Sequence, residues 1–287
     1  TNTYHCYGCG EHGDAIAFVM KKEGLTFAEA VRKLAHKYNI PIEEETDERS
    51  NEEREAAKKR EALQVVYQVV QKYFVEALYK DTPEAKQALA YATSRWNKDF
   101  CMETGIGYAP NAWQGLIDFA KKQSLSLDLL IEVGLVKISE KTGKPFDFFR
   151  ERLMIPIRDK FGVIIGYTAR DLTGKEDSPK YLNSPTSILY KKEKSVFGID
   201  IAARAAVLQH SFFLVEGAPD VLRLQSITVT NAVASLGSDW TDDQLAILKR
   251  YSDTLIFLPD ADPPKRNKPF GTGIEKVLKT GRRAWEQ

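Results

Sequence analysis

Acidic side chains follow two apolar runs of strand length in the second half of the chain, at 212–215 and 255–258. The acids that follow the runs are Glu216, Asp220, Asp260 and Asp262. Helical patterns lie between the runs, and strands that alternate with helices predict a parallel sheet. Because the carboxyl ends of parallel strands meet at one edge of a sheet, we expect these acids to lie together. Carboxylates gathered without basic neighbours in sequence indicate a hard divalent cation, above all Mg²⁺ (or Mn²⁺).

Each of these acids also has a purely structural interpretation. Asp220 follows Pro219, and an acid in the first turn of a helix complements the helix dipole. Asp260 and Asp262 precede Pro263 and would be suitable turn formers. That all of them fall at strand ends of one β-α-β series favours the metal site.

Two cysteines near the start have the spacing of a metal-binding loop. Cys6 and Cys9 form a Cys-x-x-Cys motif with Gly8 and Gly10, which suits two thiolate ligands of Zn²⁺. A redox motif or two free thiols are the alternatives, but the thioredoxin-like context of a redox motif is missing. Zinc takes four ligands, so we expect the remaining pair upstream of the first residue.

Composition restricts the classes of protein that fit. The 287 residues suffice for about two domains, and the hydrophobic fraction of 43% is ordinary for a globular protein. A net charge of +1 excludes a global basic field, so contact with nucleic acid must depend on local patches. With no signal peptide, no membrane span and only three cysteines, we expect a cytoplasmic protein. A first residue other than Met and an unfinished last helix suggest a fragment of a longer protein.

Helical patterns dominate the first half of the chain. We expect one helix capped by Asp14 and a second opened by a capping box of Thr26 and Glu29. A long amphipathic helix is predicted at about 52–79, and another starts at Pro83.

The pattern changes in the middle of the chain. A turn is predicted at 105–110, followed by helices at about 113–123 and 127–133. Strand-like runs at 153–157 and 163–170 then predict a hairpin.

Basic and aromatic side chains surround this hairpin. The cations are Arg150, Arg152, Arg158, Lys160, Arg170, Lys180, Lys191, Lys192 and Lys194, and the interleaved aromatics are Tyr167, Tyr181 and Tyr190. Such a set suits single-stranded nucleic acid, because cations neutralise phosphates and aromatic rings stack on bases. Nearby acids dilute the patch, so a solvated charged face is the alternative.

In their order along the chain, these motifs resemble bacterial DnaG-type DNA primases. "HCYGCGEHGDAIAF" resembles the second half of the family's zinc-binding domain. "RERLMIPIRDKFG" and "PKYLNSP" resemble its template-facing basic part, and "VEGAPD" and "LPDAD" resemble its Toprim module. The resemblance covers nearly the whole chain. It implies an α+β fold with a partial zinc-ribbon module, a mixed α+β basic subdomain, and a truncated α/β Toprim module with a mainly parallel sheet.

The resemblance also implies domain boundaries. We expect the C-terminal part of the zinc-binding domain at 1–42, a linker at 43–60, the basic subdomain of the RNA polymerase domain at 61–205, and the Toprim module at 206–287. The Toprim module would be truncated at its C-terminus, and further acids of its metal site would follow the last residue.

Site residues are carried over position by position. Glu216, Asp260 and Asp262 would hold Mg²⁺, with Glu216 as a possible general base and Asp220 as a fourth catalytic acid. Cys6 and Cys9 would hold Zn²⁺. The residues expected to meet template or nucleotide are Arg170, Lys180, Tyr181, Arg95, Arg152 and Lys191.

The implied activity is primer synthesis. A primase joins ribonucleoside triphosphates on a single-stranded DNA template by metal-dependent nucleotidyl transfer, and its product is an RNA–DNA hybrid. A replicative helicase would bind through a region absent here, within the replisome. The alternatives are a non-catalytic nucleic-acid-binding regulator and another Toprim enzyme, either a nuclease or a topoisomerase. Ala218 and Pro219 after the Glu-Gly pair, and basic residues at 263–270, depart from the family and suggest a mobile-element or phage-like variant.

Overall fold

The structure is a computed structural model that describes residues 3–8, 10–38, 40–41, 51–237, 239–261, 263 and 271–286. Two predicted site residues, Cys9 and Asp262, lie outside the described residues, as does the first part of the predicted linker, 43–50. The remaining predicted site residues can all be located.

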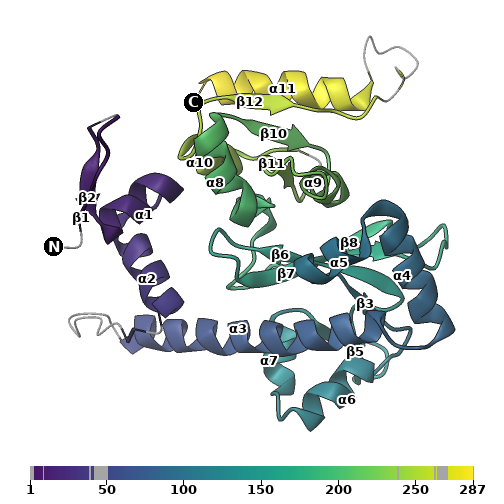
Figure 1. Cartoon of the computed structure of the whole chain (residues 1–287). Coiled ribbons are helices and arrows are strands. Elements are labelled where there is room, and N and C mark those ends of the chain that lie inside the picture. Colours follow the sequence, from purple (N-terminus) through teal and green to yellow (C-terminus); the bar gives the residue numbers. More distant parts are fainter. Residues whose placement is uncertain are drawn as a thin grey trace.

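A small module opens the chain and lies to one side of the rest (Figure 1). It consists of an antiparallel strand pair followed by two helices: β1 (Thr3–His5), β2 (His12–Asp14), α1 (Ala15–Glu23) and α2 (Phe27–Tyr38).

The predicted helix caps of this module are confirmed. The Asp14 carboxylate accepts the Ala17 N–H at 2.7 Å and caps α1. Thr26 and Glu29 exchange the two bonds of a capping box, since each backbone N–H donates to the side chain of the other residue.

The central part is a four-stranded antiparallel sheet with helices around it. Its strand order is β3-β6-β7-β8. The strands are β3 (Gly107–Ala109), β6 (Arg152–Arg158), β7 (Ile164–Asp171) and β8 (Tyr181–Asn183). The helices are α3 (Asn51–Leu78), α4 (Pro83–Arg95), α5 (Lys98–Thr104), α6 (Gly115–Lys122) and α7 (Leu127–Glu132), and a small pair is formed by β4 (Val136–Ile138) and β5 (Pro145–Asp147).

Most of the predicted elements of this part are confirmed, with two exceptions. The β6–β7 hairpin and the long α3 agree with expectation. The turn predicted at 105–110 is wrong, because Gly107–Ala109 is a buried edge strand paired with β6. The other exception concerns the stretch predicted as a linker (43–60), because α3 begins at Asn51 and covers its second half.

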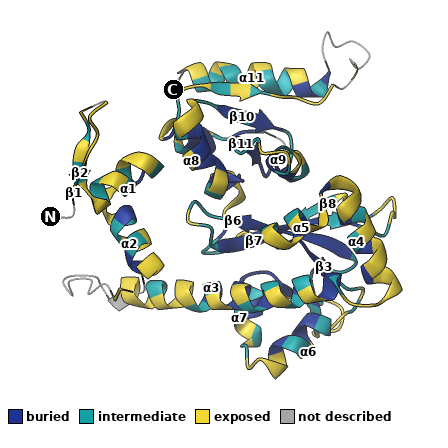
Figure 2. Ribbon diagram, viewed as in Figure 1, coloured by how far each residue is buried: buried dark blue, intermediate teal, exposed yellow. Residues whose placement is uncertain are grey.

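Two of the three aromatics that we assigned to a nucleic-acid surface belong to the core instead. Tyr167 is 0% exposed and Tyr190 1%, and the strands that carry the core are dark blue in Figure 2. The Tyr167 ring packs at 5.3 Å from the ring of Phe74 on α3, and its hydroxyl donates to Gln71 at 3.0 Å. Only Tyr181 of the three is left partly exposed.

The last part is a second four-stranded sheet with the order β12-β10-β11-β9. β10 runs parallel to β11 and β12, and β9 is antiparallel to β11, so the sheet is mainly parallel as predicted. The elements are η1 (Lys192–Lys194), β9 (Val196–Phe197), α8 (Ile199–Gln209), β10 (Phe212–Val215), α9 (Ala218–Gln225), β11 (Ala232–Ser235), α10 (Asp242–Lys249), β12 (Leu255–Phe257) and α11 (Thr272–Glu286). β9 joins this sheet although it precedes the expected boundary at 206.

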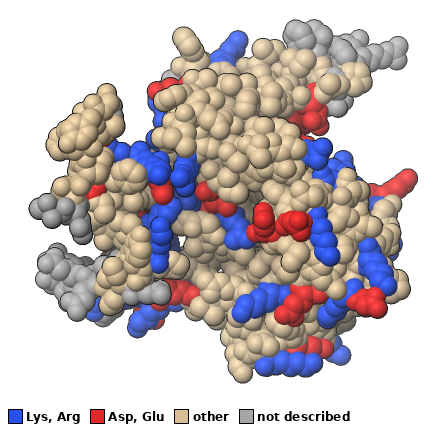
Figure 3. Space-filling view, viewed as in Figure 1, with Lys and Arg blue, Asp and Glu red and all other residues tan. Residues whose placement is uncertain are grey.

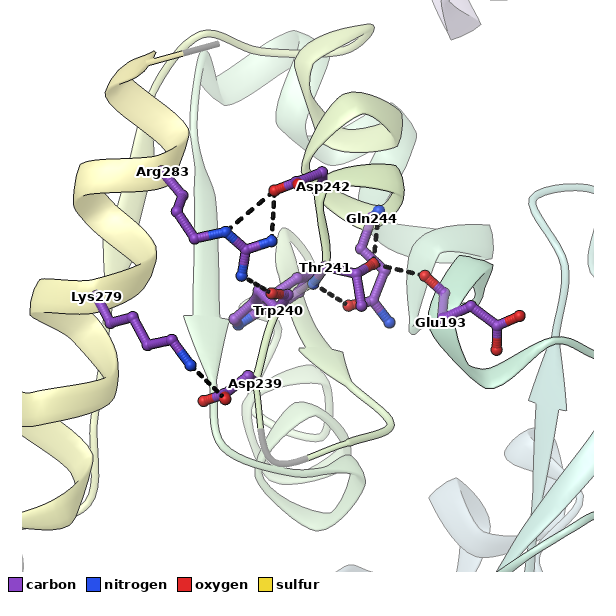
Figure 4. A network of polar contacts seen from close by, with 8 residues as sticks. All are labelled: Glu193, Asp239, Trp240, Thr241, Asp242, Gln244, Lys279 and Arg283. Carbon is purple, nitrogen blue, oxygen red and sulfur yellow. Dashed lines mark hydrogen bonds and ion pairs between the residues drawn. The ribbon is translucent and has the colours of Figure 1, made fainter.

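Ion pairs fix α11 against the loop before α10 (Figure 4). Lys279 Nζ lies 2.9 Å from an Asp239 carboxylate oxygen. Arg283 pairs with Asp242 and donates to the carbonyl of Trp240 at 2.8 Å. These contacts hold α11 beside the sheet. No helix in the described part of the chain is long and apolar enough to cross a membrane.

Candidate metal and nucleic-acid site

Glu216 and Asp260 lie together at the carboxyl edge of the second sheet. Glu216 directly follows β10, and Asp260 comes shortly after β12, the parallel neighbour of β10. The Asp260 N–H donates to Glu216 Oε1 at 3.2 Å. The sequence prediction that parallel strands would bring these acids to one edge is therefore confirmed.

A glycine of α11 makes this close arrangement possible. A Cβ atom at Gly273 would lie 2.6 Å from Glu216 Oε1 and 2.8 Å from the Asp260 carbonyl oxygen. Any larger residue would displace one of the two strand ends. Gly273 thus lets the helix backbone approach the acids directly.

Asp220 is both a helix-capping residue and a neighbour of the other acids. Its carboxylate accepts the Gly217 N–H at 3.1 Å, at the start of α9. Burial raises the pKa of Asp220, and the negative charges of Asp260 and Glu216 raise it further. The Gly217 N–H and Arg95 act in the opposite direction and lower it. The structural interpretation and the site interpretation of Asp220 are therefore compatible.

Lys276 of α11 is a member of this site that sequence reasoning missed. Its Nζ lies 3.6 Å from Glu216 Oε2, and both side chains are partly buried. The cation offsets part of the negative charge that gathers at the sheet edge. Within the described ranges no three His, Cys, Asp or Glu side chains form a group that could hold a metal ion; Asp262, the remaining predicted ligand, is outside them.

A basic and aromatic face adjoins the acids. The Arg170 guanidinium lies 5.3 Å from the centre of the Tyr181 ring and 5.9 Å from that of Tyr91, and Arg95 lies 5.2 Å from the Tyr91 ring. Burial raises the pKa of the Tyr181 hydroxyl, Arg170 and Arg95 lower it, and Asp220 raises it. Tyr181 is thus within electrostatic reach of both the cations and the acids.

Arg170 has donors that nothing in the described part of the chain accepts. Its Nε and Nη1 atoms are buried without a hydrogen-bond partner. A buried unpaired donor is costly. The side chain as a whole is partly exposed, so a phosphate oxygen would bind the guanidinium through its remaining donors. Arg170 is therefore the best-supported anion-binding side chain of this face.

Arg152, which was also predicted to meet template or nucleotide, is held mainly by internal contacts. It is 6% exposed. It donates to the carbonyls of Ala169 and Pro179 at 3.3 and 3.0 Å and to Ser178 Oγ at 2.8 Å, and it pairs with Asp171 at 3.5 Å. These partners give Arg152 a structural role.

Lys191, the N-cap of η1, and Lys192, its first residue, have side chains that lie in different parts of the surface. Lys192 Cε would lie 3.4 Å from a Cβ at Gly237, which follows β11 at the same carboxyl edge as the acids. Lys191, the lysine chosen from sequence, lines a different cavity of about 580 Å³. Lys180 is exposed beside Tyr181. Lys191 and Lys192 are adjacent in sequence, and only the fold shows that their side chains lie in different places.

An exposed tryptophan is the second feature that the sequence did not reveal. Trp113 is 63% exposed, and the Arg150 guanidinium lies 3.9 Å from the centre of its ring. Both residues line a cavity of about 510 Å³ together with Lys175 and Leu182 of the β7–β8 region. Such a stacked pair offers a flat face and a positive charge, which suits unpaired bases and their phosphates.

The cysteine loop is tight, as its glycines predicted. The Gly10 N–H donates to the Cys6 carbonyl at 2.8 Å, and Gly10 has a left-handed φ of 75°. Cys6 is exposed. Burial, in contrast, raises the pKa of the Cys101 thiol to about 11, so this cysteine stays protonated and unreactive.

Three known families match successive parts of the chain. They are described as "CHC2 zinc finger" (1–50), "DNA primase catalytic core, N-terminal domain" (73–203) and "Toprim-like" (213–266). A protein of Staphylococcus aureus (strain COL), "DNA primase", is 30% identical over 284 residues, which is 99% of this chain and 45% of that protein. The chain thus spans less than half the length of this curated relative.

Solved structures give the same result for the fold. The RNA polymerase domain of Mycobacterium tuberculosis primase DnaG is 31% identical, with a TM-score of 0.64 over 70% of this chain and 67% of that one. A DnaG primase catalytic domain bound to single-stranded DNA is 28% identical, with a TM-score of 0.65 over 78% of this chain and 66% of that one.

Proposed function

Because the chain belongs to the DnaG-type primase family, we propose that it carries the catalytic core of a DNA primase that makes RNA primers on single-stranded DNA. The observation that carries this proposal is the meeting of Glu216 and Asp260 at one sheet edge, with the Arg170–Tyr181 face beside it. Ribonucleoside triphosphates are the proposed substrates, and an RNA–DNA hybrid is the proposed product. A replicative helicase is the proposed partner.

Glu216, Asp260 and Asp262 are the proposed ligands of Mg²⁺ or Mn²⁺. Asp220 lies close enough to add to the negative charge of this site. The hydrogen bond from the Asp260 N–H to Glu216 and the proximity of Asp220 to both acids support this set of ligands. Divalent ions, when bound, lower the pKa of the primer 3′-hydroxyl and clamp the triphosphate. Lys276 would limit repulsion among the acids until an ion binds.

The template and nucleotide are assigned to the cations and rings next to these acids. Arg170 would bind a phosphate through the exposed part of its guanidinium, and Lys180 and Arg95 would add positive charge. Tyr181 and the Trp113–Arg150 pair would offer faces to bases. Tyr181 lies within electrostatic reach of Arg170, Arg95 and Asp220, which supports a strand that runs from this face toward the proposed metal ligands.

The domain organisation is proposed on the same basis. We assign the zinc-binding part to 1–42, the linker to 43–50, the basic subdomain to 51–191, and the Toprim module to the residues from η1 onward. These boundaries follow from α3, which begins at Asn51, and from β9, which joins the second sheet.

Template-dependent incorporation of ribonucleotides by the full-length protein tests the proposal. We expect Asp260→Ala to lower primer synthesis by about 100-fold or more, because a carboxylate ligand is lost at the reacting phosphate. Undiminished synthesis by this variant would exclude the assigned site. Binding of single-stranded DNA without any synthesis by the wild type would instead favour a non-catalytic regulator.

Zinc content tests the assignment of the N-terminal loop. We expect about one equivalent of Zn²⁺ in the full-length protein, as for a structural site, and loss of that zinc in Cys6→Ser. Cys101→Ser is the matched control, since its thiol is buried and protonated. Retention of zinc by Cys6→Ser, measured by elemental analysis, would remove this cysteine from the ligand set.

A further inference from the structure

A large basic cleft lies where the N-terminal module meets the rest of the chain. Its volume is about 580 Å³. Figure 3 shows Lys and Arg atoms concentrated around a hollow at this junction. We name it the junction cleft and define it by its cations, which are Arg60, Arg158, Lys160, Lys191, Lys194 and Arg250. The two acids of its lining are Asp159 and Asp243, so the cleft has an excess of positive charge.

The cations of the cleft differ in whether their charged groups have partners within the protein. Arg158 donates to the carbonyls of Gly162 and Thr104, and Lys194 pairs with Asp243 at 3.5 Å. Arg60, Lys191 and Arg250 are exposed, and their charged groups form no ion pair or hydrogen bond with a described residue. Three cations without a partner among the described residues, from three separate elements, therefore face one cavity.

The floor of the cleft is apolar. Val196, Ile199 and Tyr251 are buried residues of its lining, and Ile188 and Ile247 are partly exposed there. Cations above an apolar floor suit a ligand with both phosphates and flat apolar rings. A chain of nucleotides has this chemistry, whereas an acidic peptide would leave the apolar floor without a matching partner.

The N-terminal module contacts two residues of the cleft lining. Glu29 of α2 forms an ion pair with Lys160 at the hairpin tip. A Cβ at Gly24, which ends α1, would lie 2.9 Å from the Tyr251 ring. Two lining residues of the cleft, Lys160 and Tyr251, thus touch the module that carries Cys6, and the lining also includes Lys191.

We propose that the junction cleft binds the sugar-phosphate backbone of single-stranded DNA and leads the strand from the N-terminal module to the polymerase core. This proposal rests on the proposed primase function for the identity of the ligand. It assigns Lys191, with Arg60 and Arg250, to a contact region separate from the Arg170–Tyr181 face. Lys192, the next residue, then marks the point at which the strand reaches the edge of the second sheet.

The test compares two double variants of the full-length protein by fluorescence anisotropy with a labelled single-stranded oligonucleotide of about 20 nucleotides. Lys191→Ala/Arg250→Ala removes two cations of the cleft that no described residue pairs. Lys72→Ala/Lys122→Ala removes two exposed lysines from α3 and α6 that line none of the described cavities. Both pairs remove the same charge, so a difference between them reports position.

We expect the cleft variant to bind the oligonucleotide about tenfold more weakly at low salt. The slope of log affinity against log salt should fall by about 1.4, since each lost phosphate contact to a single strand contributes ~0.7. The control variant should keep the wild-type affinity and slope. Unlabelled ribonucleoside triphosphate should displace little of the oligonucleotide from the cleft, because a free nucleotide spans too few of the cations; efficient displacement would assign the cleft to free nucleotides and overturn the proposal.

Primer synthesis by the same variants separates this proposal from the function on which it rests. Wild-type affinity of the cleft variant, with synthesis intact, would overturn the cleft and leave the primase assignment in place. A wild-type protein that neither binds single-stranded DNA nor makes primers would overturn both.

Discussion

Glu216→Gln is expected to reduce primer synthesis by roughly 100-fold or more, because it removes a negative charge from the proposed metal site. The substitution keeps the shape of the side chain, and the amide oxygen can still accept the Asp260 N–H that Glu216 Oε1 accepts at 3.2 Å. The loss therefore measures charge rather than folding. Initial rates of ribonucleotide incorporation at saturating Mg²⁺ are the measurement.

Glu140→Gln is a suitable control for this variant. Glu140 is exposed in the turn between β4 and β5, so the substitution removes the same charge at a distant place. It should retain the wild-type rate. Affinity for single-stranded DNA should be unchanged or slightly higher in Glu216→Gln, because a carboxylate next to the DNA-binding face is neutralised. A Glu216→Gln protein as active as Glu140→Gln would contradict the catalytic assignment.

Arg152→Ala is expected to lower the free energy of unfolding by about 3 kcal/mol, because it leaves the buried Asp171 carboxylate without its cation. Arg152 and Asp171 side chains are each 7% exposed, and Arg152 also holds Ser178 and the carbonyl of Pro179. Urea unfolding monitored by circular dichroism gives the value.

Lys180→Ala is the matched comparison for Arg152→Ala, because it removes an exposed cation from the same region. Lys180 is exposed, so its loss should leave the unfolding free energy nearly unchanged and weaken the affinity for single-stranded DNA. Arg152→Ala should lower the unfolding free energy but leave the affinity for single-stranded DNA nearly unchanged, when that affinity is measured well below the unfolding transition. A stable Arg152→Ala protein with weak DNA binding would restore Arg152 to the nucleic-acid surface.

The contrast between Arg152 and Lys180 shows which properties of a basic residue could be predicted from the sequence. Both are basic, and both lie in motifs that resemble the family's template-facing part. The hairpin that contains Arg152 was predictable, because strand periodicity and the turn before β7 are local properties. Its burial was not, because it depends on β8 and the loop that carries Ser178 folding over β7.

The acidic site could be predicted for a similar reason, and its surroundings could not. Glu216 and Asp260 come after strands, and parallel strands bring the residues beyond their carboxyl ends to a common edge. Lys276 and Gly273 reach the same edge from α11, whose position depends on ion pairs with Asp239 before α10 and with Asp242 at its start. Trp113 and Arg150 meet across separate elements. Such tertiary contacts leave no periodic signal in a single sequence.

The attachment of η1 has a mechanical consequence. Gln244 Nε2 donates to the carbonyls of Lys192 and Ser195 at 3.1 and 2.8 Å, and Thr241 donates to the carbonyl of Glu193. The backbone of the segment with both lysines is therefore fastened to α10, which packs in the same part of the protein as Glu216 and Asp260. The spacing between Lys192 and these acids is thus set within one part of the chain, so a phosphate held by Lys192 would lie at a fixed distance from them.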